Sequence, residues 1–187
     1  MKTYCTDDTG HEVEFVTTFA IEPSTTMASV SGEVRSYNPN NPTTIMLMQG
    51  DQVKYTTVIT KSSGSGQVTQ PFTFENVVPG EYTLVINKLA HTTFTVINII
   101  VGDDDIDLTQ DNRKAVQIMT LRCGDIGSDG LINDSDLTIL WMLANYNRKS
   151  SDAENQLCDL NGDGMINDMD LTILWLVYNY NQGAIVI

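Results

Sequence analysis

A segment near the C-terminus of the chain occurs twice, and this duplication restricts the possible fold more than any other feature of the sequence. Residues 125–147 align with residues 159–181 at an offset of 34, with 15 identities in 23 positions. The identities include the run DLTILW, which begins at Asp136 in the first copy and at Asp170 in the second. Agreement at one fixed offset indicates an internal repeat, so we expect two equivalent structural units here.

Each copy opens with the ligand spacing of a calcium-binding loop. Calcium takes about six to eight oxygen ligands, and a 12-residue loop provides them from positions 1, 3, 5, 7, 9 and 12, with glycine at position 6 for a sharp turn. The second copy has the turn glycine, Gly164, and a complete ligand set. These ligands are Asp159, Asn161, Asp163, the carbonyl of Met165, Asn167 (directly or through water) and Asp170.

The first copy fits the same pattern with one departure. Its ligands are Asp125, Asp129, the carbonyl of Leu131, Asn133 and Asp136. Position 3 is Gly127, which offers no side-chain oxygen, and we expect water to take that place. The first loop keeps the three aspartates of the second loop but lacks its side-chain ligand at position 3, so the first site should bind calcium more weakly than the second. Two acidic turns without metal would need this spacing to recur by accident, and the sequence therefore predicts two calcium ions.

Position 12 separates this module from the calcium sensors. A sensor EF-hand has glutamate there and a helix on each side of the loop, whereas this chain has Asp136 and Asp170, and residues 115–122 have the pattern of a strand. Residues 123–182 instead resemble a type I dockerin. The resemblance implies a small all-α module of two F-hand loop–helix repeats that docks onto a cohesin of a scaffold protein. It also implies a non-catalytic part of an extracellular, polysaccharide-degrading complex, the cellulosome of anaerobic bacteria.

Upstream of the repeat, the chain is rich in short β-like segments. Alternating or β-rich runs span residues 13–21, 28–37, 44–48, 52–60, 68–74, 82–88, 92–101 and 115–121. Turn sequences such as NPNNP at residues 38–42 and Pro79-Gly80 separate them. Because alternating strands need a second sheet to bury their apolar faces, we expect an Ig-like β-sandwich over residues 11–121, with no helix required.

One stretch of the expected sandwich carries a second resemblance. Residues 72–86, FTFENVVPGEYTLVI, are similar to a motif of Cna-B-type and carboxypeptidase-regulatory-like Ig sandwiches. With a dockerin at residues 122–187, this implies an X-module–dockerin pair. Only residues 122–124 separate the last expected strand from the first loop, too few for a flexible tether, so we expect one rigid body. The favoured role of the sandwich is structural, with carbohydrate binding as the alternative. For the chain as a whole, a calcium-switched regulator is the alternative to an anchoring module.

The segments after the loops supply the candidate contact surface. The helices expected over residues 136–146 and 170–180 are apolar nearly all round, and a small module can bury only one face of each. We assign to the core Leu137, Leu140, Ala144, Leu171, Leu174 and Tyr178. The dockerin resemblance implies that another set faces the cohesin: Asp134, Ser135, Trp141, Met142, Asn145, Tyr146, Asp168, Met169, Trp175, Leu176, Asn179 and Tyr180.

The two tryptophans are the expected anchors of this contact, because large aromatic side chains dominate many interfaces. Burial of both in the core is the alternative, since tryptophan is highly buried on average. The surfaces of the two copies are alike, with Ser135 against Met169 as the clearest difference. The sequence is therefore compatible with binding in two orientations related by an internal two-fold axis.

Composition excludes several other functions. The net charge is −14 and neither half is basic, so nucleic acid is not an expected partner. No apolar run reaches about 18 residues, so no membrane span is expected. The start MKTYCTDDTG lacks the apolar core of a signal peptide, and we expect the sequence to be part of a longer secreted protein. Apart from its partner, the chain is expected to be a monomer.

Single reactive residues give no sign of catalysis. His11 and His91 have no partnered serine or cysteine motif. Three cysteines are too few for a disulfide framework, and we expect Cys123 and Cys158 to be buried thiols rather than a disulfide. The apolar tail at residues 183–187 is expected to pack near the dockerin start or between the modules, with fraying as the alternative.

Overall fold

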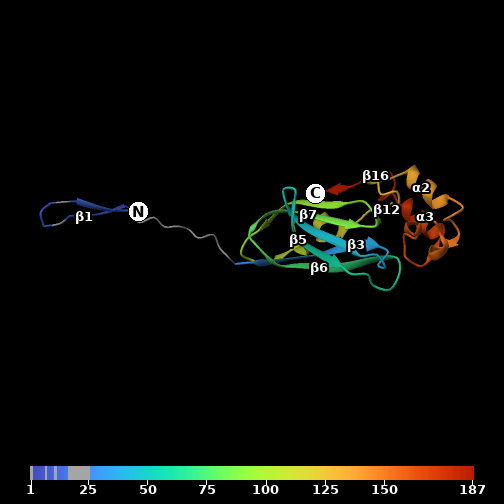
Figure 1. The fold of residues 1–187 in the computed structure, drawn as a ribbon, viewed down its shortest axis with the longest axis horizontal. Helices are drawn as coiled ribbons and strands as arrows, with labels where there is room; N and C mark the ends of the chain where they lie inside the picture. Colours follow the sequence, from blue (N-terminus) through green and yellow to red (C-terminus); the bar gives the residue numbers. More distant parts are fainter. Residues whose placement is uncertain (1, 7, 11, 17–25) are drawn as a thin grey trace.

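The computed structural model of the protein describes residues 2–6, 8–10, 12–16 and 26–187 (Figure 1). Near the N-terminus, β1 (Lys2–Thr6) and β2 (Glu12–Val16) form an antiparallel hairpin. The strand expected over residues 13–21 agrees with β2 as far as residue 16, and residues 17–21 lie outside the described residues, as does His11. Residues 26–187 form a β-sandwich followed by a smaller C-terminal module (Figure 1).

The sandwich consists of two sheets. One has the strand order β17-β9-β7-β4-β5, and the other has β10-β3-β11 with β6 also paired to β3. The strands are β3 (Ala28–Tyr37), β4 (Thr43–Gln49), β5 (Gln52–Ile59), β6 (Gln67–Val77), β7 (Gly80–Lys88), β9 (Phe94–Val101), β10 (Ile106–Asp107), β11 (Met119–Thr120) and β17 (Ile185–Val186). Parallel pairing occurs where β10 and β11 join β3 and where β17 joins β9.

Alternating side chains produce this two-layer arrangement. Along β3 every second residue is buried, and β7 shows the same alternation after its first residues. Val34 and Phe72 of one sheet and Ile45 and Leu84 of the other are buried in one common core. Removal of these apolar side chains from water is the main driving force for pairing the sheets. The structure of the N-terminal domain is predominantly β, as expected.

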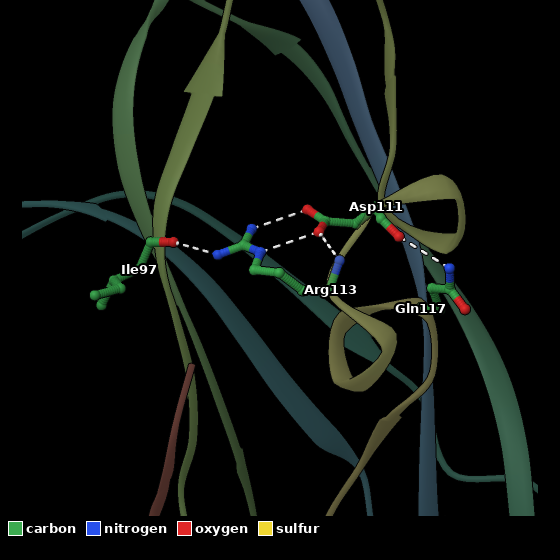
Figure 2. A network of polar contacts seen from close by, with 4 residues as sticks. All are labelled: Ile97, Asp111, Arg113 and Gln117. Carbon is green, nitrogen blue, oxygen red and sulfur yellow. Dashed lines mark hydrogen bonds and ion pairs between the residues drawn. The ribbon is translucent and has the colours of Figure 1, made fainter.

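The strand expected over residues 115–121 is wrong for most of its length. Most of the first half of this segment belongs to α1 (Lys114–Gln117), which follows η1 (Leu108–Gln110), and the only strand in it is β11. Figure 2 shows the reason: Arg113 forms an ion pair with Asp111 at 2.9 Å and donates a hydrogen bond to the carbonyl of Ile97 at 2.9 Å. Gln117 Nε2 donates to the Asp111 carbonyl at 2.9 Å within the same segment, and the bond from Arg113 to Ile97 joins that segment to the sandwich (Figure 2).

The C-terminal module combines two helices with very short strands. Its elements are β12 (Cys123–Asp125), β13 (Leu131–Ile132), α2 (Asp134–Trp141), β14 (Arg148–Lys149), η2 (Ser150–Asp152), η3 (Gln156–Cys158), β15 (Met165–Ile166), α3 (Asp168–Leu174) and β16 (Gln182–Gly183). The strand of each loop pairs with the end of the other copy, β13 with β16 and β14 with β15. The two copies are thus joined reciprocally, and helix is not the only regular structure of the module.

Both helices begin earlier and end sooner than expected. The side chain of Asn133 accepts a hydrogen bond from the Ser135 amide, and Asp136 Oδ2 accepts one from the Asn133 amide at 2.9 Å, so α2 starts at residue 134. At the other end, the Asn145 side chain donates to the Ile139 carbonyl at 2.7 Å and uses a carbonyl at the end of the helix. The equivalent bonds shape α3, so the helices expected over residues 136–146 and 170–180 are corrected.

Shorter helices change part of the expected core. Leu140, Leu171 and Leu174 are buried as expected. Tyr178 is 44% exposed and does not belong to this core, because its hydroxyl donates to the carbonyl of Thr120 at 2.7 Å beside the sandwich. Ile173 is buried in its place.

The two modules are in direct contact. β8 (Ala90–His91) pairs with β12, and Ala90 and Tyr37 of the sandwich pack into the core of the C-terminal module. The chain then returns to the sandwich, where β17 lies beside β9 (Figure 1). Among the described residues, no helix has the length and apolar character needed to cross a membrane.

Candidate metal loops and contact surface

In the first loop, backbone amides orient the acidic side chains. The Asp125 carboxylate accepts hydrogen bonds from the amides of Asp129 and Gly130 at 3.0 and 3.1 Å. Asp136 accepts from the amides of Gly127 and Asn133, both at 2.9 Å. The residues at positions 1 and 12 are therefore tied to the turn that lies between them.

The second loop repeats this arrangement with more bonds. Asp159 accepts from the amides of Gly162 and Gly164 at 2.9 and 3.0 Å. Asp170 Oδ1 accepts from the amides of Leu160 and Asn161, and its Oδ2 accepts from the Asn167 amide. The Asn161 side chain in addition donates to Asp163 at 2.9 Å, a bond that Gly127 cannot make in the first loop.

The carboxylates at loop positions 1 and 12 are buried without a cationic partner, whereas those at position 5 are exposed. Asp125, Asp136, Asp159 and Asp170 are all buried, and within residues 26–187 no lysine or arginine forms an ion pair with them. Burial raises the pKa of Asp170 to about 6 and also raises the pKa of Asp125 and Asp159, and neighbouring aspartates add to each shift. Negative charge is therefore costly in both loops until a cation compensates for it.

The donor set fits a hard cation that accepts neutral oxygens as well as carboxylates. In the described part of the chain, no three histidine, cysteine or acidic side chains converge into a metal site by themselves. Calcium sites of the loop type also use asparagine and backbone carbonyl oxygens, which both loops contain. The loops therefore suit calcium better than a metal that needs a cluster of histidine or cysteine.

The two tryptophans lie at the surface, so their burial in the core is excluded. Trp141 is 51% and Trp175 49% exposed, and their rings contact each other edge to face with centroids 6.3 Å apart. The ring of Trp141 also lies 6.4 Å from that of Tyr146. The sequence-predicted neighbours Met142, Leu176 and Met169 are exposed as well. The structure thus brings contact candidates from both copies together.

Asn145 and Asn179 are corrections to the predicted contact set. Both are only 1% exposed. Each side chain donates to a carbonyl at the end of its own helix. The Asn145 side chain also accepts a hydrogen bond from the Asn155 amide, and the Asn179 side chain accepts one from the Cys123 amide. These residues hold the helix ends in place, and their buried side chains are not on the module surface.

Four other predicted contact residues bind each other across the repeat. The Tyr146 hydroxyl donates to the carboxylate of Asp168, and the Tyr180 hydroxyl donates to that of Asp134. Each pair joins the end of one copy to the start of the helix in the other. The two aspartates are exposed, so they remain on the surface while being held by tyrosines.

Sequence reasoning missed the two most exposed apolar side chains of the module. Leu143 is 90% and Val177 93% exposed, at equivalent positions of the two copies. Continuous helices had been expected there, and the breaks after Trp141 and Leu174 turn these side chains outward. The only sequence sign was that both copies keep a large apolar residue at this position. Residues 141–143 and 175–177, which contain these two side chains together with Trp141, Met142, Trp175 and Leu176, are called the tryptophan segments.

The residues considered for catalysis are engaged elsewhere. Both ring nitrogens of His91 have partners, the Tyr37 amide and the Leu89 carbonyl, and burial lowers the pKa of His91 to about 4. Cys123 and Cys158 are free and buried, as expected, and burial raises the pKa of each thiol. The histidine and both thiols are therefore largely shielded from solvent.

Comparisons with known proteins agree with this geometry. Residues 123–175 match the dockerin type I domain family. No curated protein matches the sequence. Two similar solved structures are an N-terminal and a C-terminal interface mutant of a type II cohesin–X–dockerin complex from Acetivibrio cellulolyticus, with TM-scores of 0.59 and 0.58. Each is 23% identical and the alignment covers 83% of this chain and 97% of the other. The chain has the fold of an X-module followed by a dockerin.

Proposed function

We propose, from the match of residues 123–175 to the dockerin type I family, that this chain docks onto a cohesin module of a scaffold protein in a calcium-dependent manner. The observation that carries the proposal is the exposed tryptophan pair at the ends of the helices that follow two loops with buried carboxylates that have no cationic partner. The similar solved structures are themselves cohesin complexes. The chain would serve as a non-catalytic attachment unit of a cellulosome-type complex outside the cell.

The metal proposal is two calcium ions, one in each loop. The first would be held by Asp125, Asp129, Leu131, Asn133 and Asp136. The second would be held by Asp159, Asn161, Asp163, Met165, Asn167 and Asp170. Bound calcium supplies positive charge that compensates for the buried carboxylates and favours the folded loops. Asn133 and Asn167 cap the starts of α2 and α3, and these two helices position the tryptophan segments that follow them.

The proposed cohesin contact consists of surface residues from both copies. It contains the tryptophan segments together with Asp134, Ser135, Tyr146, Asp168, Met169 and Tyr180. Six large apolar side chains left in water are costly, and burial against a partner would remove that cost. Because the two tryptophans contact each other, we place them at the centre of the contact, where anchor residues are usually found.

The proposed domain division is a β-sandwich at residues 11–121 and a dockerin at residues 122–187. The last strand, β17, belongs to the dockerin by sequence and to the five-stranded sheet by pairing. The sandwich is proposed to support the dockerin, since its strand β8 and its turn at Tyr37 pack directly against it. Apart from the cohesin, the chain is proposed to act as a monomer.

Titration calorimetry with a panel of type I and type II cohesins tests the proposal. The whole chain should bind at least one cohesin in calcium and lose that binding in excess EDTA, with recovery when calcium is restored. A catalytic module of the same cellulosome without a dockerin is the negative control. Equal binding with and without calcium, or no binding to any cohesin of the panel, would contradict the proposed function.

A further inference from the structure

The β-sandwich donates three hydrogen bonds to the backbone of the second loop. Asn38 Nδ2 donates to the carbonyl of Asp159 at 2.8 Å, and Asn40 Nδ2 donates to the carbonyl of Gly162 at 2.7 Å. The Gly66 amide donates to the carbonyl of Asn161 at 2.6 Å. These carbonyls belong to loop positions 1, 3 and 4, where the side chains of positions 1 and 3 are proposed calcium ligands.

The donors form one connected platform at the end of the sandwich. The Asn38 amide donates to the Gly66 carbonyl at 3.1 Å, and Asn38 Oδ1 accepts the Asn40 amide at 3.2 Å. Asn40 Nδ2 also donates to the Gly64 carbonyl at 3.1 Å. Asn38 has a positive φ of 54°, a conformation that asparagine tolerates better than most residues. The platform therefore has a defined shape of its own.

The second loop is adapted to this platform, and the first loop is not. Gly162 has a φ of +75°, and a Cβ there would lie 2.5 Å from Asn38 Oδ1 and 2.7 Å from Asn40 Nδ2. The equivalent residue of the first loop is Ser128, which has a φ of +59° and is exposed. The loop backbone thus accepts a side chain at this position, and at position 162 a side chain would have to displace the Asn38 and Asn40 side chains of the platform.

We infer that the β-sandwich is a positioning element for the second calcium loop. The sandwich holds the carbonyls of Asp159, Asn161 and Gly162 against the platform. The side chains of Asp159 and Asn161 are thereby kept facing the proposed calcium position inside the loop. The inference rests on the proposed calcium role of this loop. Because coupling between two equilibria is reciprocal, calcium in the second loop also strengthens the contact between the modules.

The main test exchanges the residues at loop position 4 between the two loops, and it uses the whole chain. Gly162→Ser introduces the residue that the first loop carries, and Ser128→Gly is the matched control. Calcium titration calorimetry should show that Gly162→Ser weakens the stronger site by about tenfold, the effect of losing one or two net hydrogen bonds, and that Ser128→Gly changes neither site.

A second pair of variants leaves the loop itself unchanged. Asn40→Ala removes a donor of the platform, whereas Asn41→Ala removes a neighbouring side chain that forms no hydrogen bond within residues 26–187. Asn40→Ala should weaken the same site and Asn41→Ala should not. This pair decides the question if Gly162→Ser fails to fold.

Amide hydrogen exchange at Gly66 provides a readout on the sandwich side. Calcium should slow exchange of this amide in the unaltered chain, and less so in Gly162→Ser. If the unaltered chain bound no calcium, the proposed function would fail and this inference with it. If it bound calcium and Asn40→Ala left both affinities and the exchange rate of Gly66 unchanged, the inference alone would be overturned.

Discussion

Trp141 and Trp175, which occupy equivalent positions of the two repeats, contact each other edge to face at an interplanar angle of 88°. Equivalent residues that touch lie beside the axis that relates the two copies. The surface built around them is therefore a single surface shared by both copies. The sequence suggested binding in two orientations related by an internal two-fold axis, and a surface centred on that axis is compatible with both orientations.

This contact predicts the effect of substituting either tryptophan. Trp141→Ala and Trp175→Ala should each weaken cohesin binding by about 2 kcal/mol or more, since each removes half of a central aromatic anchor. Titration calorimetry provides the measurement. Ile100→Ala is the control, because Ile100 is an exposed apolar residue on β9 of the sandwich. Silent single substitutions combined with a large loss in the double variant would support two separate surfaces instead.

Removal of calcium should affect the C-terminal module most. Chelation leaves the buried loop carboxylates without compensating charge, so the melting temperature of this module should fall more than that of the sandwich. Asp159→Ala should be more damaging than Asp125→Ala, because the second loop has an oxygen ligand at position 3. Scanning calorimetry with and without EDTA checks both expectations, and an unchanged profile in EDTA would contradict them.

Lys88 should be a destabilising residue. Its side chain is buried, and within the described residues its Nζ has no hydrogen-bond partner. Burial lowers the pKa of Lys88 to about 8. Lys88→Met, which keeps the length without the charge, should raise the free energy of unfolding by about 1–3 kcal/mol in chemical denaturation at pH 7.

The pH dependence gives an independent check on Lys88. Its folded pKa lies below the ordinary value of 10.5, so the unfolded chain binds more protons between about pH 8 and 10.5. The contribution of Lys88 to stability should therefore become more favourable as the pH rises through this range, and Lys88→Met should lack that rise. The exposed Lys61→Met serves as the control, and a gain in stability of similar size there would contradict the assignment.

His91 should make the protein sensitive to mild acid. Its pKa is lowered from 6.5 to about 4 by burial, so it contributes stability above pH 6.5 that is lost as the pH falls toward 4. The full loss would be about 3 kcal/mol. His91→Gln should reduce the slope of unfolding free energy against pH between pH 7 and 5 in saturating calcium. Identical slopes for the two proteins would show that His91 is not the responsible group.

Several features follow from short stretches of sequence. The strands β3, β4 and β5 lie close to their predicted bounds because alternating side chains and turn residues act over a few neighbours. The repeat and its loop spacing were also visible directly, and the asparagine and aspartate at positions 9 and 12 form the same capping box in both copies. In each case the interacting groups are close together in the chain.

Tertiary structure decided the rest, because the interacting groups are far apart in the chain. Asn179 is buried because the Cys123 amide, 56 residues away, binds its side chain. Leu143 and Val177 are exposed because the helices stop before them, and the tryptophan contact exists because two such helix ends meet. The contact of Gly162 with the platform requires a turn of the sandwich about 120 residues upstream. Periodicity and ligand spacing describe what a segment prefers by itself, whereas these contacts depend on which distant surfaces the complete fold brings together.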